Sequence, residues 1–242
     1  MTYCVGTLVD QGLVFLSDSR TNAGVDNVGT FRKMAVYERA GDRVLVLLTA
    51  GNLAITQAVV GVLNEAIEAG ASHGLYGAAS LADAARLVGD AIRVVYARDA
   101  AALKEHHIEF SANFILGGQI GAEAPRLFQL YAAGNYIEAT AETPYFQIGE
   151  SKYGKPVIDR MVSAGSSLED VAKCLLISMD STLRSNLSVG PPLDLAIYRR
   201  DALRLERRVT LAADDPYLRT VRDRWSAALA QAFQDVPDPQ WD

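Results

Sequence analysis

Cysteine and histidine are scarce in this sequence, and each shortage excludes a class of protein. Two of the 242 residues are cysteine, Cys4 and Cys174, and three are histidine. Two cysteines are too few for a disulfide framework and fit a reducing cytoplasm, where we expect the protein to work. The histidines (His73, His106 and His107) lack the spacing of a metal site, so we expect no metal.

Positive charge and long apolar stretches are also in short supply. Lysine and arginine total 23 against 29 acidic residues, so the net charge is −6. This excess of negative charge argues against general binding to nucleic acid or to an anionic membrane. The longest uncharged run, between Arg43 and Glu65, is broken by polar residues and is too polar for a membrane span. The N-terminus has no basic region, so no signal peptide is expected.

The order of the predicted elements indicates a layered α+β protein. The sequence predicts strands at 3–9, 12–19, 30–38, 43–49, 108–117, 127–132, 145–148, 193–199 and 203–211. It predicts helices at 52–69, 80–102, 151–163, 168–183 and 215–233. Hairpin blocks separated by helix pairs favour two sheets between helix layers. We expect one domain over 1–242, with an irregular tail at 236–242 that carries two prolines.

The common catalytic motifs are missing, including the P-loop, GxGxxG, HExxH, CxxC and GxSxG. Thr2 is the informative residue, because removal of Met1 would leave it with a free α-amine. An N-terminal threonine supplies its own nucleophile and base, since its hydroxyl attacks and its amine accepts the proton. The unperturbed pKa of an α-amine, about 7.7–8.0, suits that role near neutral pH. Many proteins begin Met-Thr, so Thr2 alone is a weak signal.

Three further residues strengthen the interpretation of Thr2. Asp18 lies in Ser-Asp-Ser-Arg at the end of the second predicted strand, Lys33 lies in Phe-Arg-Lys-Met on the third, and Gly51 closes the fourth. This pattern resembles the proteasome β-subunit superfamily of N-terminal-nucleophile (Ntn) threonine hydrolases. Within it, the start Met-Thr-Tyr-Cys-Val-Gly and the segment Ser-Asn-Leu-Ser-Val-Gly-Pro-Pro are similar to the Anbu (ancestral β-subunit) branch.

The resemblance implies a fold, a mechanism and an assembly. The fold would be a four-layer αββα sandwich. Thr2 would be the nucleophile, Lys33 would ease proton transfer, Asp18 would anchor Lys33, and the Gly51 N–H would face the oxyanion. Ser188 matches a serine of the family pattern. The implied assembly is a homo-oligomer, either a ring or an open helical ring, that acts on peptides or unfolded proteins and needs no cofactor. An activator protein stays an open question.

The sequence departs from the family pattern near the expected position of the Thr2 amine. Glu150 or Ser151 could occupy the place of one family serine. Ser185 stands where an aspartate is expected, and Asp180 is a substitute more than one helical turn away. These departures put the positioning of the amine in doubt.

The resemblance also implies a pocket for the substrate residue before the cleaved bond. Its lining would come from Thr21, Phe31, Ala35, Thr49 and Leu53, which are apolar or neutral and favour uncharged substrate side chains. Cys4 is interpreted as a small buried side chain rather than a nucleophile.

Three functions remain open from the sequence. The leading one is a threonine peptidase that cleaves peptide bonds through an acyl-enzyme on Thr2. An amidohydrolase with a narrow preference for small peptide-like substrates is the second, because a fold does not fix its substrate. The third is a ring-forming scaffold or binding protein with a vestigial site.

Overall fold

A computed structural model describes residues 1–23, 27–70 and 74–241 of the chain. It contains two five-stranded sheets, and every strand pairing in the described residues is antiparallel. The expectation of a mixed helix-and-strand protein with antiparallel sheets is therefore confirmed. None of its helices in those ranges is both long and apolar enough to span a membrane.

The first sheet carries the N-terminus of the chain. In spatial order it consists of β10 (Tyr145–Gly149), β1 (Tyr3–Val9), β2 (Gly12–Asp18), β11 (Leu193–Arg199) and β12 (Arg207–Leu211). Strand β1 is fully flanked, by β10 on one side and β2 on the other. The first strand of the chain is therefore held inside the sheet, and Thr2 lies directly before it.

The second sheet has the order β5 (Met34–Arg39), β6 (Arg43–Gly51), β7 (Ala112–Ile120), β8 (Arg126–Leu130) and β9 (Tyr136–Glu138). A separate hairpin, β3 (Arg20–Ala23) and β4 (Asn27–Thr30), connects the two sheets along the chain. The sequence did not predict this hairpin or the short strand β9. It placed the start of one strand at Thr30, whereas β5 begins at Met34, so Lys33 lies just before the strand and not on it.

Five helices follow the predicted order with adjusted ends. They are α1 (Leu53–Glu68), α2 (Leu81–Glu105), α3 (Lys155–Met161), α4 (Leu168–Ser185) and α5 (Pro216–Asp235). Asn52 caps α1 and Ser80 caps α2, each accepting a hydrogen bond from a backbone N–H of the first turn. The predicted helix from 151 is shorter, because α3 begins only at Lys155 and has Pro156 in its first turn.

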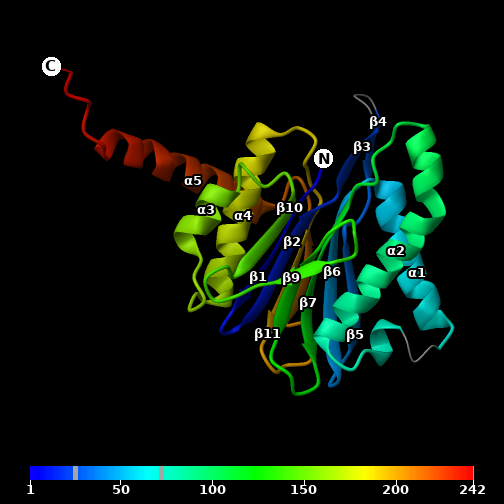
Figure 1. Ribbon diagram of the computed structural model, residues 1–242. Helices are drawn as coiled ribbons and strands as arrows, with labels where there is room; N and C mark the ends of the chain where they lie inside the picture. The colour runs from blue at the N-terminus through cyan, green and yellow to red at the C-terminus, as the bar shows by residue number, and fades with distance from the viewer. Residues whose placement is uncertain (24–26, 71–73, 242) are drawn as a thin grey trace.

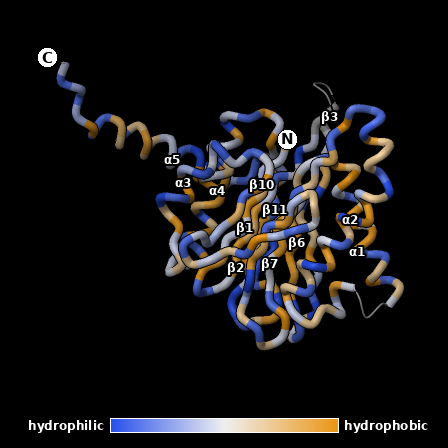
Figure 2. The backbone as a smooth tube through the Cα atoms, in the orientation of Figure 1, coloured by the Kyte–Doolittle hydropathy of each residue, from blue (hydrophilic) through white to orange (hydrophobic). Residues whose placement is uncertain are grey.

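The apolar residues form three clusters that join these elements. One cluster packs α1 and α2 against β6 and β7, and another packs α3 and α4 against β1 and β2. The third lies between the sheets and includes Phe15 from β2 and Ile115 from β7. Figure 1 shows the two helix pairs on opposite sides of the sheets, and Figure 2 shows apolar residues concentrated along the strands.

Candidate active site

Thr2 lies at the entrance to β1, where its backbone is tightly held. Its side chain is almost completely buried, whereas Met1 is 64% exposed. The carbonyl of Thr2 accepts a hydrogen bond from Glu150 N at 2.6 Å. Gly149 adopts a φ of +84°, and a Cβ at that position would lie 2.0 Å from the Thr2 carbonyl oxygen. Only glycine fits there, so the end of β10 is shaped around Thr2.

Asp18 and Lys33 form a buried ion pair beside Thr2. Lys33 Nζ donates to Asp18 Oδ1 at 2.7 Å and to the carbonyl of Arg20 at 2.6 Å. Asp18 also accepts hydrogen bonds from Tyr3 N at 3.0 Å and from Gly190 N at 3.2 Å. The carboxylate therefore links the start of β1, the lysine and the segment before β11. Charges removed from water need partners of this kind.

The free amine of the chain lies in the field of these charges. Burial lowers the pKa of the Met1 amine, and the nearby Lys33 ammonium lowers it further. Asp18 and Glu150 act in the opposite direction and raise that pKa. Burial also raises the pKa of Asp18, although Lys33 and the two N–H donors oppose this change. The N-terminus thus lies within electrostatic reach of both charged residues of the buried pair.

Two adjoining hollows open beside the N-terminus. The first, of about 390 Å³, is lined by Met1, Thr2, Thr21, Lys33, Thr49, Ala50, Gly51, Asn52, Leu53 and Thr56. The second, of about 310 Å³, shares four of these residues and adds Ala35 from β5. A substrate group could therefore reach from Thr2 past Lys33 toward α1.

Four of the five predicted substrate-binding residues line these hollows. Thr21 lines the first, Ala35 the second, and Thr49 and Leu53 line both. Phe31 lines neither hollow and is 41% exposed. Residues 31–33 form a link between β4 and β5, and the role of Phe31 stays a prediction that the lining of the hollows does not support.

Gly51 ends β6, as predicted, and it also lines the first hollow. Its φ is +120°, and a Cβ there would lie 2.3 Å from the carbonyl oxygen of Ser111. The close approach of the chain before β7 therefore requires glycine at this position. The backbone of Gly51 therefore lies next to Thr2 with no side chain between them, which leaves room for the carbonyl group of a substrate to approach.

Glu150 and Asn186 lie together beside the N-terminus. Asn186 Nδ2 donates to Glu150 Oε2 at 3.1 Å and lies 3.9 Å from the sulfur of Met1. Asn186 Oδ1 also accepts from Ser188 N at 2.9 Å, which ties Ser188 to this cluster through its backbone. Asn186 was not predicted. It follows the last residue of α4, and an amide at a helix end is common enough to carry little signal.

The remaining predicted residues, Ser151, Ser185 and Asp180, line neither hollow. Ser151 follows Glu150, and its carbonyl accepts from Lys155 N in the turn before α3. Ser185 is exposed at the end of α4. Asp180 is buried, but its carboxylate accepts a hydrogen bond from Arg222 Nε of α5 at 3.0 Å. Asp180 is thus engaged in joining α4 to α5, and it lines neither hollow.

The cysteines and histidines offer no alternative chemistry at this site. Cys4 is fully buried, and burial raises the pKa of its thiol, so the reactive thiolate is disfavoured. His106 and His107 are exposed at the end of α2, and His73 lies outside the described residues. Within the ranges that the structure describes, no three acidic, histidine or cysteine side chains gather as metal ligands would.

Comparison with known proteins places the chain in a family. No protein-family model matches it, and no curated protein does. Among solved structures, a Gly-1 mutant of Anbu from Hyphomicrobium sp. strain MC1 is 48% identical over 100% of both chains, with a TM-score of 0.93. Anbu (ancestral beta-subunit) from Yersinia bercovieri is 47% identical over 100% of both, also at 0.93.

A third structure, a helical assembly of the Anbu complex from Pseudomonas aeruginosa, is 46% identical over 99% of this chain and 98% of that chain, with a TM-score of 0.93. These relatives define the class as that of the proteasome-like β-subunits. Within that class, the chain belongs to the Anbu family.

Proposed function

We propose that the protein is a threonine-type hydrolase of peptide amide bonds, working through Thr2 after removal of Met1. The observation that carries this proposal is the buried Lys33–Asp18 pair, which also bonds to the N–H of Tyr3, the residue after Thr2. A pair that links the lysine to the start of β1 holds a positive charge close to the Thr2 hydroxyl. The first hollow supplies space for a substrate carbonyl beside it.

The reaction follows from these positions. The Thr2 hydroxyl attacks the substrate carbonyl and its proton passes to the Thr2 amine, while Lys33 stabilises the developing alkoxide. The Gly51 N–H faces the oxyanion of the tetrahedral intermediate. The amine then returns the proton to the leaving nitrogen, the C–N bond breaks, and an ester remains on Thr2. Water hydrolyses that ester by the same proton route and frees the enzyme.

In this proposal Glu150 and Asn186 hold the Thr2 amine, and they take the place of the aspartate and serines of the family pattern. Glu150 already acts on the amine of Met1 by raising its pKa. Ser188 contributes through the backbone contact that fixes Asn186. A negative carboxylate near the amine stabilises the ammonium form, which the second half of each proton transfer needs.

We also propose that the protein assembles with copies of itself, as the Pseudomonas aeruginosa relative does in its helical assembly. The three apolar clusters support a four-layer αββα sandwich formed by the whole chain as one domain. Two buried free cysteines suit a reducing compartment, and we place the protein in the cytoplasm on that ground.

Substitution of Thr2 tests the proposed chemistry. Thr2→Ala should abolish hydrolysis of a panel of N-acylated peptide amides carrying a fluorescent leaving group, whereas Thr2→Ser should retain part of it because a hydroxyl remains. Full activity in Thr2→Ala would contradict the proposal. Cleavage of only one or two short members of the panel would support a narrow amidohydrolase.

The scaffold alternative has one observation in its favour. Ser185 stands at the place of the expected aspartate and is exposed. Asp180 lies near that place, but its carboxylate bonds to Arg222. Neither residue therefore supplies the contact to the Thr2 amine that the family pattern implies. A wild-type protein that loses Met1, assembles and cleaves no member of the panel would favour a scaffold.

A further inference from the structure

The residue after Thr2 carries a buried hydroxyl group that the proposed chemistry does not use. Tyr3 and Ser178 are fully buried, and the Tyr3 hydroxyl and Ser178 Oγ share a hydrogen bond of 2.6 Å. Gln147 Nε2 donates to the Tyr3 hydroxyl oxygen at 2.7 Å. Burial raises the pKa of the Tyr3 phenol, so the hydroxyl keeps its proton. We call Tyr3, Gln147 and Ser178 the Tyr3 cluster.

The Tyr3 cluster joins three elements that meet near the N-terminus. Tyr3 begins β1, Gln147 lies on β10 and Ser178 lies in α4. Because Tyr3 pairs with Gly149, Gln147 lies two residues along β10 on the same face of the sheet. Helix α4 packs on that face. One phenol hydroxyl therefore connects the first strand of the chain both to its neighbouring strand and to the helix above it.

The turn before α3 closes one side of the cluster. A Cβ at Gly154 would lie 2.2 Å from Ser178 Oγ and 2.7 Å from the Tyr3 hydroxyl oxygen. The φ of Gly154 is −90°, so the close approach of the chain, and not an unusual backbone conformation, requires glycine there. The backbone of this turn thus leaves the two hydroxyl groups little room to move apart.

Apolar packing alone does not need the Tyr3 hydroxyl, since a phenylalanine ring would fill nearly the same space. A buried hydroxyl costs free energy unless it is hydrogen-bonded, so a satisfied one in an apolar contact favours one arrangement of the two surfaces. In the part of the chain that the structure describes, α4 otherwise meets the strands of the first sheet through apolar side chains and the exposed pair of Glu169 and Arg199. The bond between Tyr3 and Ser178 therefore fixes where α4 lies along β1.

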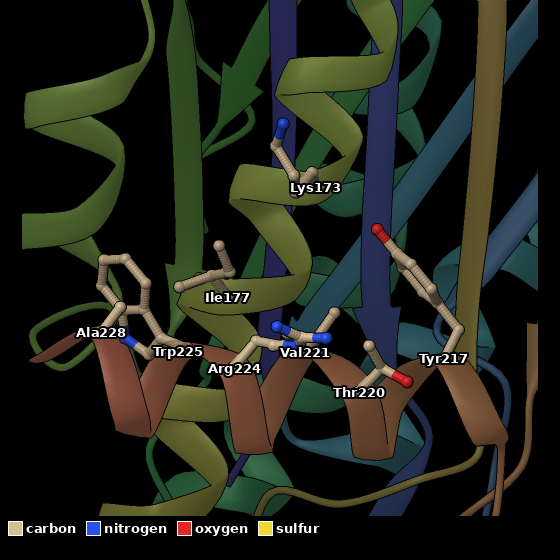
Figure 3. A pocket seen from close by; sticks show the side chains of 8 residues that line it. All are labelled: Lys173, Ile177, Tyr217, Thr220, Val221, Arg224, Trp225 and Ala228. Atoms are coloured by element: carbon tan, nitrogen blue, oxygen red, sulfur yellow. The ribbon is translucent and has the colours of Figure 1, made fainter.

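Helix α5 constrains α4 less closely from the other side. Lys173 and Ile177 project from α4, and the ring of Tyr217 extends from α5 alongside them (Figure 3). These side chains border a groove of about 340 Å³, so the two helices are not tightly packed along it. Arg222 of α5 does bond to Asp180, but its side chain is half-exposed. The side of α4 that faces the sheet thus carries the closer constraint.

The position of α4 matters because the end of this helix reaches the candidate active site. Ser178, Thr182 and Asn186 follow at intervals of four residues and lie on one side of the helix. Thr182 Oγ1 donates to the carbonyl of Ser178 at 3.0 Å, and Asn186 N donates to the carbonyl of Thr182 at 2.9 Å. Asn186 in turn donates to Glu150, whose own N–H binds the carbonyl of Thr2. A shift of α4 at Ser178 would therefore displace Asn186 and Glu150 as well.

We propose that the Tyr3 hydroxyl is a positioning group for the candidate active site. Through Ser178 it holds α4, and with α4 it holds Asn186 and Glu150 at their places beside Thr2. The same bond fixes Tyr3 itself, whose N–H is bound by Asp18. The hydroxyl touches no reacting atom, so it acts only through these neighbours. Its effect on reactivity rests on the proposed function, whereas its effect on the geometry of the N-terminus does not.

Tyr3→Phe tests the proposal, because it removes the hydroxyl and keeps the ring. Amide hydrogen exchange, measured by mass spectrometry on the peptide that contains Glu150, should become about two- to tenfold faster, as expected for the loss of one buried hydrogen bond. Labelling of Thr2 by a β-lactone, an electrophile that acylates the threonine hydroxyl, should slow by a similar factor.

Tyr198→Phe is the matched control. Tyr198 is also fully buried, and its hydroxyl donates to Gln119 Oε1 at 2.6 Å, but it pairs with Leu13 at the end of the sheet away from Thr2. Both variants should lose a similar free energy of unfolding in urea. Only Tyr3→Phe should change exchange at Glu150 and the labelling of Thr2.

The pH profile of labelling supplies a readout that a general loss of stability would not move. Lys33, Asp18 and Glu150 are the charged groups that act on the amine of Met1. Tyr3→Phe should let Glu150 move away from the Thr2 amine, which removes a cause that raises its pKa. The acid side of the profile should then shift toward lower pH in Tyr3→Phe and stay in place in Tyr198→Phe.

Ser178→Ala, alone and combined with Tyr3→Phe, provides a second route to the same test. The two hydroxyl groups act as a unit, so the double variant should label hardly more slowly than either single variant. Exchange and labelling in Tyr3→Phe that match wild type, or that change no more than in Tyr198→Phe, would overturn the proposal. Faster exchange at Glu150 in Tyr3→Phe, where a β-lactone does not label even the wild type, would support the positioning role and contradict the proposed chemistry.

Discussion

Lys33 and Asp18 lie 2.7 Å apart in almost complete burial, at 5% and 0% side-chain exposure, and the same Asp18 oxygen accepts the N–H of Tyr3. A surface ion pair is worth about 0–1 kcal/mol, and a buried one gains its effect by fixing geometry rather than by adding stability. The burial and geometry of this ion pair therefore favour a role in placing charge at Thr2 over a role in stabilising the fold.

A double-mutant cycle on this pair separates chemistry from stability. Lys33→Ala leaves the Asp18 carboxylate buried without its ion partner and should cost about 3–5 kcal/mol of unfolding free energy. Adding Asp18→Asn should restore part of that stability, because an amide oxygen can still accept the N–H of Tyr3. Urea unfolding measures the free energies, and the rate of β-lactone labelling measures Thr2 reactivity. Lys33→Ala should slow the labelling of Thr2, and the labelling rate should stay low in the double variant. Recovery of labelling together with stability would contradict a direct role for Lys33.

The pH dependence of labelling should report on the Thr2 amine. Burial and Lys33 lower the pKa of the Met1 amine. The Thr2 amine that removal of Met1 would free lies one residue closer to β1, and we expect the same two causes to lower its pKa, so that its neutral, basic form persists to lower pH than in a free peptide. Labelling should therefore fall on the acid side with a midpoint below the unperturbed value of about 7.7–8.0.

Glu150→Gln should shift the acid side of the pH profile of labelling further toward low pH. Glu150 raises the pKa of the Met1 amine. If it acts in the same way on the Thr2 amine, removing its charge lowers the pKa of that amine and shifts the acid side of the labelling profile to lower pH. Glu206→Gln, which alters an acid paired with Arg199 on the surface, is the control and should leave the acid side in place. An unchanged acid side in Glu150→Gln would show that the carboxylate does not act on the amine, and a shift to higher pH would contradict the direction proposed here.

Gly51 offers a test of the local geometry. Gly51→Ala places a methyl group against the carbonyl of Ser111 in a left-handed conformation, and we expect a loss of about 1–3 kcal/mol or more, with slower labelling. Gly41 also has a positive φ of +80° but has nothing within 4 Å of its Cβ position. Gly41→Ala should thus show a smaller loss in urea unfolding and unchanged labelling. Equal losses in the two variants would mean that Gly51 is not specially constrained.

The second hollow should govern which substrates fit. Ala35→Phe would fill it, and peptides with a large uncharged residue before the cleaved bond should lose kcat/KM at least about tenfold. A small β-lactone needs only the first hollow and should label Thr2 at the wild-type rate. Ala54→Phe, at an exposed position on α1, is the control. Unchanged selectivity in Ala35→Phe would place the substrate side chain elsewhere.

The sequence predicted those parts of the site that depend on residues close together in the chain. Asp18 and Gly51 end strands whose apolar runs are clear in the sequence, and the predicted helices begin at 52 and 80, where the structure has the caps Asn52 and Ser80. Lys33 was found through the motif around it, although its strand begins one residue later. These features depend on neighbours in the chain.

The features that the sequence left open depend on contacts between distant segments. Asn186 meets Glu150 only because α4 ends beside β10, and a polar residue at a helix end does not announce such a partner. Asp180 was a candidate for the site because of its charge, but Arg222 binds it from α5. The helix at 215–233 was predicted, whereas the exposure of its residues beyond Trp225 depends on the position of α4.

The most direct test of the central claim is intact-protein mass spectrometry of the assembled protein, with and without a β-lactone. We predict loss of Met1 and a single adduct that maps to Thr2. Cys4 and Cys174 should stay unlabelled, since burial raises the thiol pKa of both, that of Cys174 to about 11. Loss of Met1 without an adduct, or an adduct that persists in Thr2→Ala, would contradict a nucleophilic role for Thr2.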